Sequence, residues 1–384
     1  MDTIIDPKVL EDYEEQRQEQ TVEKEDTSNG PLMDKPFNPK EIDIKTKQMT
    51  LDLLIKRLKA TPVEIDLYPD FQRKDDLWDE KKQSQLIESI LINFPLPAFY
   101  FDGSNNSKWL VVDGLQRLSA LRNFVIKKSL KLQGLEFLTK LNGDGYDALP
   151  RPLQRQIEET QIVAYIINPG TPPEVKFNIF KRVNTGGLVM EPQEIRHALN
   201  QGKPAKCVAD LANQIAFKEA TENIINPNRM LDREFITRFV SFYINTYNDY
   251  KPDLDTFMNK SMGSINELSD KEQEEMKQNF IEAMKVAKEI FGNWAFRKAD
   301  KYPERRKPIN KALFEVWSVV LAKLKSDERQ KLKINKIQLM ESFVELTKVD
   351  TKFKDAITSA TGDKPRVIYR FSTIENLVQK ILKL

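Results

Sequence analysis

The chain has very few of the residues that build metal and thiol sites. Its 384 residues include one cysteine, Cys207, and one histidine, His197. A single cysteine excludes an internal disulfide and a cysteine-based zinc cluster. A single histidine is too few for a metal nuclease that relies on several, and it permits a Ser-His-Asp hydrolase only if His197 itself serves. We interpret His197, which follows Arg196 in a short helical stretch, as a structural residue.

Two further absences narrow the class of protein. No apolar run approaches the length needed to cross a bilayer, and the N-terminus is acidic rather than basic and apolar like a signal segment. We therefore expect a cytoplasmic protein without membrane contact. The sequence also has no Walker-type glycine-lysine loop, so it is not a P-loop enzyme.

The charge is unevenly distributed, although the whole chain has a net charge of only +2. Residues 1–30 hold ten acidic and three basic residues, which leaves a net charge of +9 on the remainder. Residues 1–35 are rich in Glu and Gln and poor in aromatics, which predicts a flexible acidic arm. The arm either serves as a solubilising tail or shields a basic surface from nucleic acid.

The hydrophobic pattern predicts an α+β core followed by a helical domain. A hydrophobic content of 40% over 384 residues is enough for two domains. Residues 36–171 alternate strands and helices, including a helix at 80–93 capped by Asp79 and a hairpin of 98–101 with 109–112. Residues 172–384 show helical spacing, with one further candidate strand at 367–369.

The most informative motif is the run from Asp113 to Arg117. It follows the apolar strand 109–112 and opens a segment of helical periodicity, so it predicts a strand-to-helix corner. Such a corner offers backbone N–H groups to an anion, and Gly114 lets the backbone approach a ligand closely. Arg117 can grip a phosphate, and Asp113 can hold a metal ion or orient a water. The alternative is a tight turn with a structural Asp–Arg pair.

Two other polar groups have the same ambiguity. Gln72 and Arg73 follow the predicted strand 63–67, and Trp78 can stack on a base or anchor the next helix. The loop carrying Asn184, Thr185 and Gly186 follows a predicted helix at 173–183. It is either a helix C-cap and turn or a loop that closes over a ligand.

A late basic segment is interleaved with aromatic residues. This composition suits a nucleic-acid surface, and the alternative is a solvated loop between helices. The candidate nucleic-acid contacts are Arg297, Lys298, Arg305, Arg306 and Lys307.

Three motifs in order resemble a known family. They are FQRKDDLWDEKKQSQLIESILINFPLPAFYF, VVDGLQRLSALRNF, and FKRVNTGG followed by QEIRHAL. The stretch from about residue 49 to about residue 250 resembles domain-of-unknown-function family 262, which includes the S half of GmrSD-type restriction systems. The resemblance implies a core similar to the ParB/sulfiredoxin fold, nucleotide binding and hydrolysis at the Asp-Gly-x-Gln-Arg corner, and a role in defence against phage DNA.

Residue by residue, the resemblance assigns the corner to Asp113, Gly114, Gln116 and Arg117, and the upstream pair to Gln72 and Arg73. Leu115 departs from the commoner Gln at its position and leaves one fewer polar group. Relatives that cut DNA often carry a second, HNH-type nuclease domain. The single histidine of this chain does not supply one.

Two functions therefore stand against each other. In the first, the protein is a nucleotide hydrolase: Asp113 binds Mg²⁺ or positions water, Gln116 orients that water, and Arg117 stabilises developing charge on a nucleoside triphosphate. Arg73 would hold phosphates, and Asn184 to Gly186 would close the pocket. In the second, the corner senses a nucleotide or DNA without turnover and signals to a separate nuclease or effector partner.

Overall fold

The structure, a computed structural model, describes residues 21–23, 25, 39–67, 78–105, 107–183 and 190–384. The chain divides into two compact units, Phe37–Leu199 and Asn200–Leu384, and the second includes the described residues of Met1–Pro36. This division lies later than the expected boundary at 171. Helices α6 (Pro173–Val183) and α7 (Pro192–Leu199) contact each other, and α6 also contacts the sheet.

The first unit is built on a mixed five-stranded sheet with the order β1-β5-β3-β4-β2. Strands β1 and β5 pair antiparallel, as do β3 and β4, whereas β3–β5 and β2–β4 are parallel. The strands are β1 Ile44–Thr50, β2 Ile65–Asp66, β3 Phe99–Asp102, β4 Trp109–Asp113 and β5 Gln161–Ile167.

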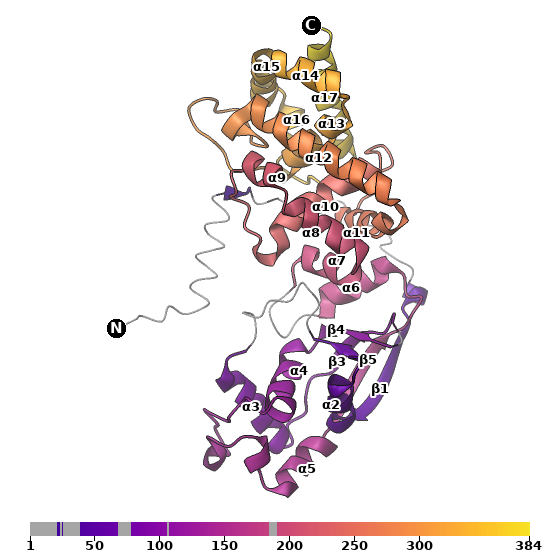
Figure 1. Cartoon of the computed structure of the whole chain (residues 1–384), viewed down its shortest axis with the longest axis vertical. Helices are drawn as coiled ribbons and strands as arrows, with labels where there is room; N and C mark the ends of the chain where they lie inside the picture. The colour runs from indigo at the N-terminus through magenta and orange to yellow at the C-terminus, as the bar shows by residue number, and fades with distance from the viewer. Residues whose placement is uncertain (1–20, 24, 26–38, 68–77, 106, 184–189) are drawn as a thin grey trace, which may run out of the picture. The chain divides into compact units, whose positions relative to one another are not determined.

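Alternation along the strands sets the core of this unit. Phe99, Phe101 and Val111 are buried on one face, where they join an apolar cluster with side chains from helices α2 to α5 (Figure 1). On the other face Tyr100 stacks on Tyr165 of the neighbouring strand, with ring centroids 4.8 Å apart. The helices are α2 Leu51–Lys59, α3 Glu80–Leu91, α4 Leu115–Leu121 and α5 Arg151–Glu159; α4 continues into a π-helical turn, Arg122–Ile126. Short 3-10 turns lie at Pro39–Glu41, Thr139–Leu141 and Tyr146–Ala148.

The regular secondary structure in the described part of the second unit is helical, apart from isolated bridges. Helix α13 is its central element, because eleven of its residues are buried, and Phe314 on this helix lies edge-on to Phe235 and Phe217. No helix among the described residues combines the length and apolar character needed to cross a membrane. The helices are α8 Lys203–Ala212, α9 Ile215–Ala220, α10 Leu231–Ile244, α11 Leu254–Ser264, α12 Asp270–Phe291, α13 Lys311–Lys323, α14 Ser326–Ile334, α15 Lys336–Val349, α16 Thr351–Ala356 and α17 Lys364–Leu382, with 3-10 turns at Asn228–Met230, Ile265–Glu267 and Gly292–Trp294.

The α+β prediction is confirmed, including the hairpin, the capped helix and the strand-to-helix corner. Asp79 caps α3 by accepting a hydrogen bond from Lys82 N at 2.7 Å. The candidate strand at 367–369 is wrong, because these residues lie inside α17. Its buried residues, which include Val367, Phe371 and Ile374, recur at helical spacing, and this longer pattern outweighs the local β-branched run.

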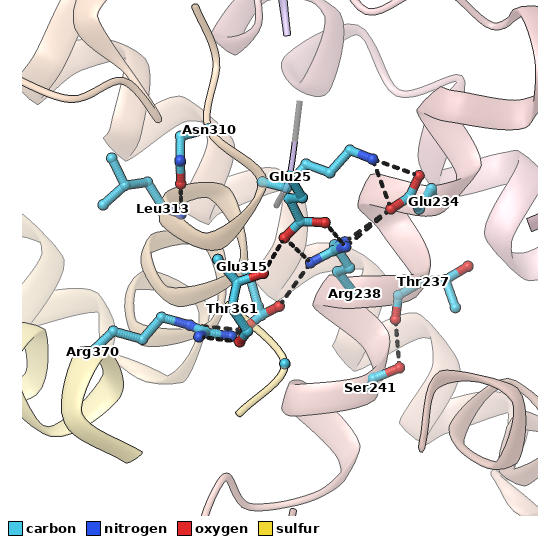
Figure 2. A network of polar contacts seen from close by, with 12 residues as sticks. Glu25, Glu234, Thr237, Arg238, Ser241, Asn310, Leu313, Glu315, Thr361 and Arg370 are labelled. Carbon is cyan, nitrogen blue, oxygen red and sulfur yellow. Dashed lines mark hydrogen bonds and ion pairs between the residues drawn. The ribbon is translucent and has the colours of Figure 1, made fainter. Parts of the chain in front are cut away.

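A buried ionic network crosses the second unit (Figure 2). Glu315 on α13 and Arg370 on α17 are both fully buried, and Arg370 Nε donates to Glu315 at 3.1 Å. Arg238 on α10 contacts the other oxygen of Glu315 at 3.4 Å. Glu25, from the predicted acidic arm, pairs with Arg238. The described residues around Glu25 therefore pack against the helical unit, in contrast to the solvated arm expected for 1–35.

The buried carboxylate of Glu88 holds the loop at residues 136–138 in the first unit. Glu88 on α3 is 4% exposed and accepts hydrogen bonds from the backbone N–H groups of Glu136, Phe137 and Leu138 at 3.0, 2.8 and 2.7 Å. Burial raises the pKa of Glu88, but the three N–H donors together outweigh it and hold the pKa below its ordinary value. The ionised carboxylate is therefore the form that stabilises the fold.

We expect Glu88→Ala to lower the free energy of unfolding by roughly 3 kcal/mol, because three charge-assisted hydrogen bonds are lost at once. Since the folded pKa of Glu88 lies below its unfolded value, this stabilisation is complete above the ordinary glutamate pKa. The charge-dependent part is lost as pH falls through the lowered value, so the difference in stability between wild type and variant should narrow in acid. Urea unfolding at neutral and acidic pH measures both effects.

The matched control is Glu136→Ala, which removes an exposed carboxylate from the same loop. We expect it to change stability by less than about 0.5 kcal/mol. Equal losses in the two variants, or a gap that widens in acid, would contradict the role assigned to Glu88.

Candidate functional site

The strand-to-helix corner requires a glycine. Strand β4 ends at Asp113, Gly114 has a φ of +100°, and α4 begins at Leu115. A Cβ at position 114 would lie 2.5 Å from Cδ1 of Phe99 on β3. The left-handed backbone and the close approach of the Phe99 ring therefore both exclude a side chain here. The backbone therefore turns sharply at Gly114. Asp113 lies at the end of β4, directly before the first turn of α4.

Arg117 is held by its own chain on several sides. Its side chain is 9% exposed, and its guanidinium group donates to the carbonyl oxygen of Pro97, to that of Ala98 at 3.1 Å and to Asp113 Oδ2 at 2.8 Å. It also lies over the Phe99 ring, 4.4 Å from the centroid. The guanidinium thus ties α4 to the residues that lead into β3, and most of its surface faces protein.

The Asp113 carboxyl is partly buried beside this guanidinium. Its side chain is 21% exposed. Burial raises the pKa of Asp113 above its ordinary value, and the charge of Arg117 with a hydrogen bond from the Gly114 N–H lowers it only in part. Burial also lowers the pKa of Arg117. The charge of Asp113 and their hydrogen bond raise this pKa again, but only in part. A partly exposed carboxyl with a raised pKa can exchange a proton or meet a cation, which marks a candidate functional group.

Gln116 connects the corner to the upstream motif. Its Oε1 accepts a hydrogen bond from Trp78 N at 2.8 Å, and the Trp78 carbonyl accepts one from Gln83 Nε2 at 2.6 Å. Trp78 follows directly on the segment that contains Gln72 and Arg73, which lie outside the described residues. Trp78, the first described residue after this segment, is therefore bonded to Gln116 at the corner.

The predicted closing loop, with Asn184, Thr185 and Gly186, also lies outside the described residues. The helices on either side of it are described. On α7, Arg196 is 1% exposed, and its Nε donates to Gln193 Oε1 at 2.8 Å. His197 is 2% exposed, in agreement with its interpretation as a structural residue.

The basic segment is largely paired within the helical unit. Arg297 is 4% exposed and bonds Glu222 at 2.9 Å, and Arg306 bonds the same carboxylate at 2.8 Å. Lys298 pairs with Glu23 and donates to Thr358 Oγ1 at 2.8 Å. Arg297 therefore stabilises the fold instead of presenting a charge to nucleic acid.

The remaining basic positions are nearer to solvent. Lys307 lies 3.9 Å from Asp300, a distance at the limit of an ion pair, and Arg305 is exposed. The interleaved aromatics pack on each other, since Trp294 and Tyr302 meet edge to face with centroids 5.0 Å apart. Of the five candidate contacts, Arg305 best retains the exposure that a nucleic-acid contact requires.

Sequence reasoning missed the acceptors that hold Arg117. The carbonyl groups of Pro97 and Ala98 are backbone atoms, so no side-chain motif announces them. The available signal was the stretch Phe94-Pro95-Leu96-Pro97. Its prolines favour an extended chain, in which carbonyl groups are left free to accept hydrogen bonds from side chains. Among the described residues, no three His, Cys, Asp or Glu side chains gather closely enough to hold a metal ion. Asp113 is therefore a single candidate ligand.

Comparison with known proteins gives one match. Residues 53–201 match the family model of the GmrSD restriction endonuclease N-terminal domain. The match covers less than half of the chain, and it includes the corner, α6 and α7. No curated protein and no solved structure matches the chain. This part of the protein is thus similar to GmrSD restriction endonuclease N-terminal domains.

We expect Gly114→Ala to destabilise the protein more than an alanine at another left-handed glycine. The positive φ alone costs about 1–2 kcal/mol, and the contact with Phe99 adds about 1–3 kcal/mol of overpacking. Urea unfolding of the full chain measures the loss.

Gly143→Ala is the matched control. Gly143 has a φ of +95°, and a Cβ there would meet nothing within 4 Å. It should therefore show the backbone cost alone. Similar losses in the two variants would mean that the Phe99 ring does not constrain the corner.

Proposed function

We propose that the protein acts in a restriction-type defence against foreign DNA, and that its Asp113–Gln116 corner binds and hydrolyses a nucleoside triphosphate. The relation of residues 53–201 to GmrSD restriction endonuclease N-terminal domains supports the setting. The finer assignments, to family 262 and to a ParB/sulfiredoxin-like core with a nucleotide-binding Asp-Gly-x-Gln-Arg motif, belong to this proposal.

The observation that carries the proposal is the bond from Trp78 to Gln116. Two motifs about forty residues apart in sequence meet at one corner through this 2.8 Å contact. A phosphate site gathers polar side chains from separate segments around one ligand. The bond supports such a site because it places Gln116 beside Trp78, the first described residue after the Gln72–Arg73 segment.

In this proposal Asp113 and Gln116 act on the substrate and Arg117 is a positioning residue. The partly exposed Asp113 carboxyl would orient the attacking water and take up its proton, which its raised pKa favours. Arg117 would fix the rotamer of Asp113 through their 2.8 Å bond. Gln72, Arg73, Gly114 and residues 184–186 would bind the phosphates.

A magnesium ion fits the corner only in part. Mg²⁺ is commonly held by one or two carboxylates together with substrate phosphates and water. Asp113 can supply one such carboxylate oxygen, since its other oxygen is engaged by Arg117, and it would then serve as a ligand in place of a proton acceptor. Bound Mg²⁺ would neutralise charge on the phosphates.

A second candidate function is nucleotide or DNA sensing without turnover, coupled to a separate nuclease or effector. One observation favours it: the Arg117 guanidinium is already bonded to Pro97, Ala98 and Asp113. A group so engaged is poorly placed to follow charge that develops on a transferred phosphoryl group. The cation that binds phosphate would then be Arg73, with a role in affinity.

The deciding measurement is phosphate release from a panel of nucleoside triphosphates with Mg²⁺, with and without DNA. We expect turnover of at least one nucleotide, and a decrease of about 10²-fold or more in Asp113→Asn, which removes the proton acceptor. The amide oxygen of this variant would still accept from Arg117, but the buried guanidinium would lose its carboxylate partner, so the protein should also be less stable. Urea unfolding therefore defines conditions in which the variant is fully folded, and the rates are compared there.

Asp147→Asn is the control, because this exposed carboxylate is paired with Lys128 away from the corner. Its rate should equal that of the wild type. Nucleotide binding without phosphate release from any member of the panel would favour the sensing function. Neither binding nor release would contradict both candidate functions.

A further inference from the structure

Residues 21–23 and 25, here called the strap, form one β-bridge with the helical unit. Ile309 N donates to Thr21 O at 2.9 Å, and Glu23 N donates to Ile309 O at 2.7 Å, so Val22 and Ile309 form a parallel bridge. Ile309 bridges Arg297 on its other side. The strap therefore completes a row of backbone hydrogen bonds, which is the way proteins bind extended peptides by strand addition.

The side chains of the strap fit separate positions. Val22 is 6% exposed and joins the apolar core. Glu23 accepts hydrogen bonds from Lys298 and from Asn310 Nδ2, the latter at 3.0 Å. Glu23 and Glu25 thus have different partners.

Glu25 occupies the deeper of the two acid positions. It accepts hydrogen bonds from Arg238 and, at 2.6 Å, from Thr361 Oγ1 (Figure 2). Its side chain is 11% exposed. We call the surface formed by Arg238, Lys298, Ile309, Asn310 and Thr361 the strap groove.

The charge of the groove explains why it selects acids. The buried cluster beneath it has three cations, Arg238, Lys311 and Arg370, and two carboxylates, Glu234 and Glu315. Glu25 supplies the third carboxylate and balances them. Lys298 and Glu23 form a further pair at the edge. Without two acids at these places, the groove would hold a surplus of buried positive charge.

The groove has room beyond the first residue of the strap. Thr21 lines a cavity of about 540 Å³ together with residues of α8, α9 and the start of α10, including Asn213, Thr221 and Asp232. The groove therefore adjoins a cavity at the N-terminal end of the described strap.

We propose that the strap groove is a recognition site for an extended acidic peptide, and that the strap occupies it in cis as an exchangeable resident. The peptide has an apolar residue followed by acids one and three positions later, as Val22, Glu23 and Glu25 do. A partner protein presenting such a segment displaces the strap. The backbone pairing to Ile309 and the apolar Val22 position select a peptide, because a nucleic-acid backbone has neither feature.

This inference concerns the helical unit and does not rest on the nucleotide corner. Among the described residues, strap and groove are attached by two carboxylates, by the buried side chain of Val22 and by a single backbone bridge. The remaining apolar core is built from residue 205 onward. Exchange of the strap therefore leaves that core in place.

The test uses the full chain with a protease site inserted between residues 27 and 36, so that the strap can be cut after folding. The probe is a fluorescein-labelled peptide of residues 15–30, followed by anisotropy. The uncut chain should bind the probe at least about tenfold more weakly than the cut chain. A tethered strap competes at an effective concentration on the order of millimolar, whereas a cut strap dissociates.

Matched variants separate recognition from general attraction. In the probe, Glu25→Gln should weaken binding at least about tenfold, and Glu19→Gln, which removes the same charge outside the strap, should not. In the protein, Lys298→Met should weaken binding, and Lys301→Met should not, because Lys301 is exposed and lies outside the groove. Urea unfolding before and after cutting reports whether the helical unit stays folded.

Several outcomes would overturn the proposal. If the unit unfolds on cutting, or if excess probe never displaces the cut strap, the strap is a permanent part of the core. Equal effects of the Glu19 and Glu25 changes would mean unspecific attraction. Competition by duplex DNA as strong as that by unlabelled peptide would assign the groove to nucleic acid. Concentration-dependent dimers lost in Glu25→Gln would mean that a second copy supplies the strap.

Discussion

The helical unit depends on the matching of one buried carboxylate. Glu315 is fully buried within the apolar core, where burial raises its pKa against the opposing effect of Arg370 and Arg238. An unmatched charge there would cost several kcal/mol, so the chain brings guanidinium groups to it from α17 and α10. Those arginines need further acids in turn, and Glu234 and Glu25 provide them. Packing of three helices and of the strap thus follows from one ionisable group.

The same constraint governs the corner in the sheet unit. Arg117 is buried and is matched by two carbonyl groups and Asp113. Its bonds therefore serve the architecture of β3 and α4, and the Asp113 carboxyl is the more exposed member of the pair. A charged residue at such a corner can fix the geometry of its neighbour instead of facing solvent. This division explains how a corner with Leu115 in place of a polar residue can keep a defined shape.

Features of the sheet unit that depend on neighbours in sequence were predicted well. Features that depend on contacts between distant residues were not. The Asp79 cap, the hairpin and the corner at Gly114 depend on neighbours in sequence, so they could be predicted from it. Strand β1 was missed because its lysines mark it as polar; it lies at the sheet edge, where charged side chains are tolerated. The acceptors of Arg117 and the later division of the chain depend on contacts that no spacing encodes. Gln72, Arg73 and residues 184–186 lie outside the described residues, so their part in the site remains a prediction.

The acidic arm and the basic segment illustrate how composition misleads when each is considered alone. Separately they indicate a solvated tail and a nucleic-acid surface. In the structure they meet, since Glu23 pairs with Lys298, and the same short stretch places Glu25 on Arg238. Arg297 and Arg306 share Glu222 in the same way. A positive run therefore indicates a nucleic-acid site only after the acids of the same chain have been placed, and here those acids lie up to 275 residues away. Such pairs form without any local sequence signal. The near-neutral net charge of the whole chain, +2, therefore indicated the internal pairing of charges better than either charged segment did.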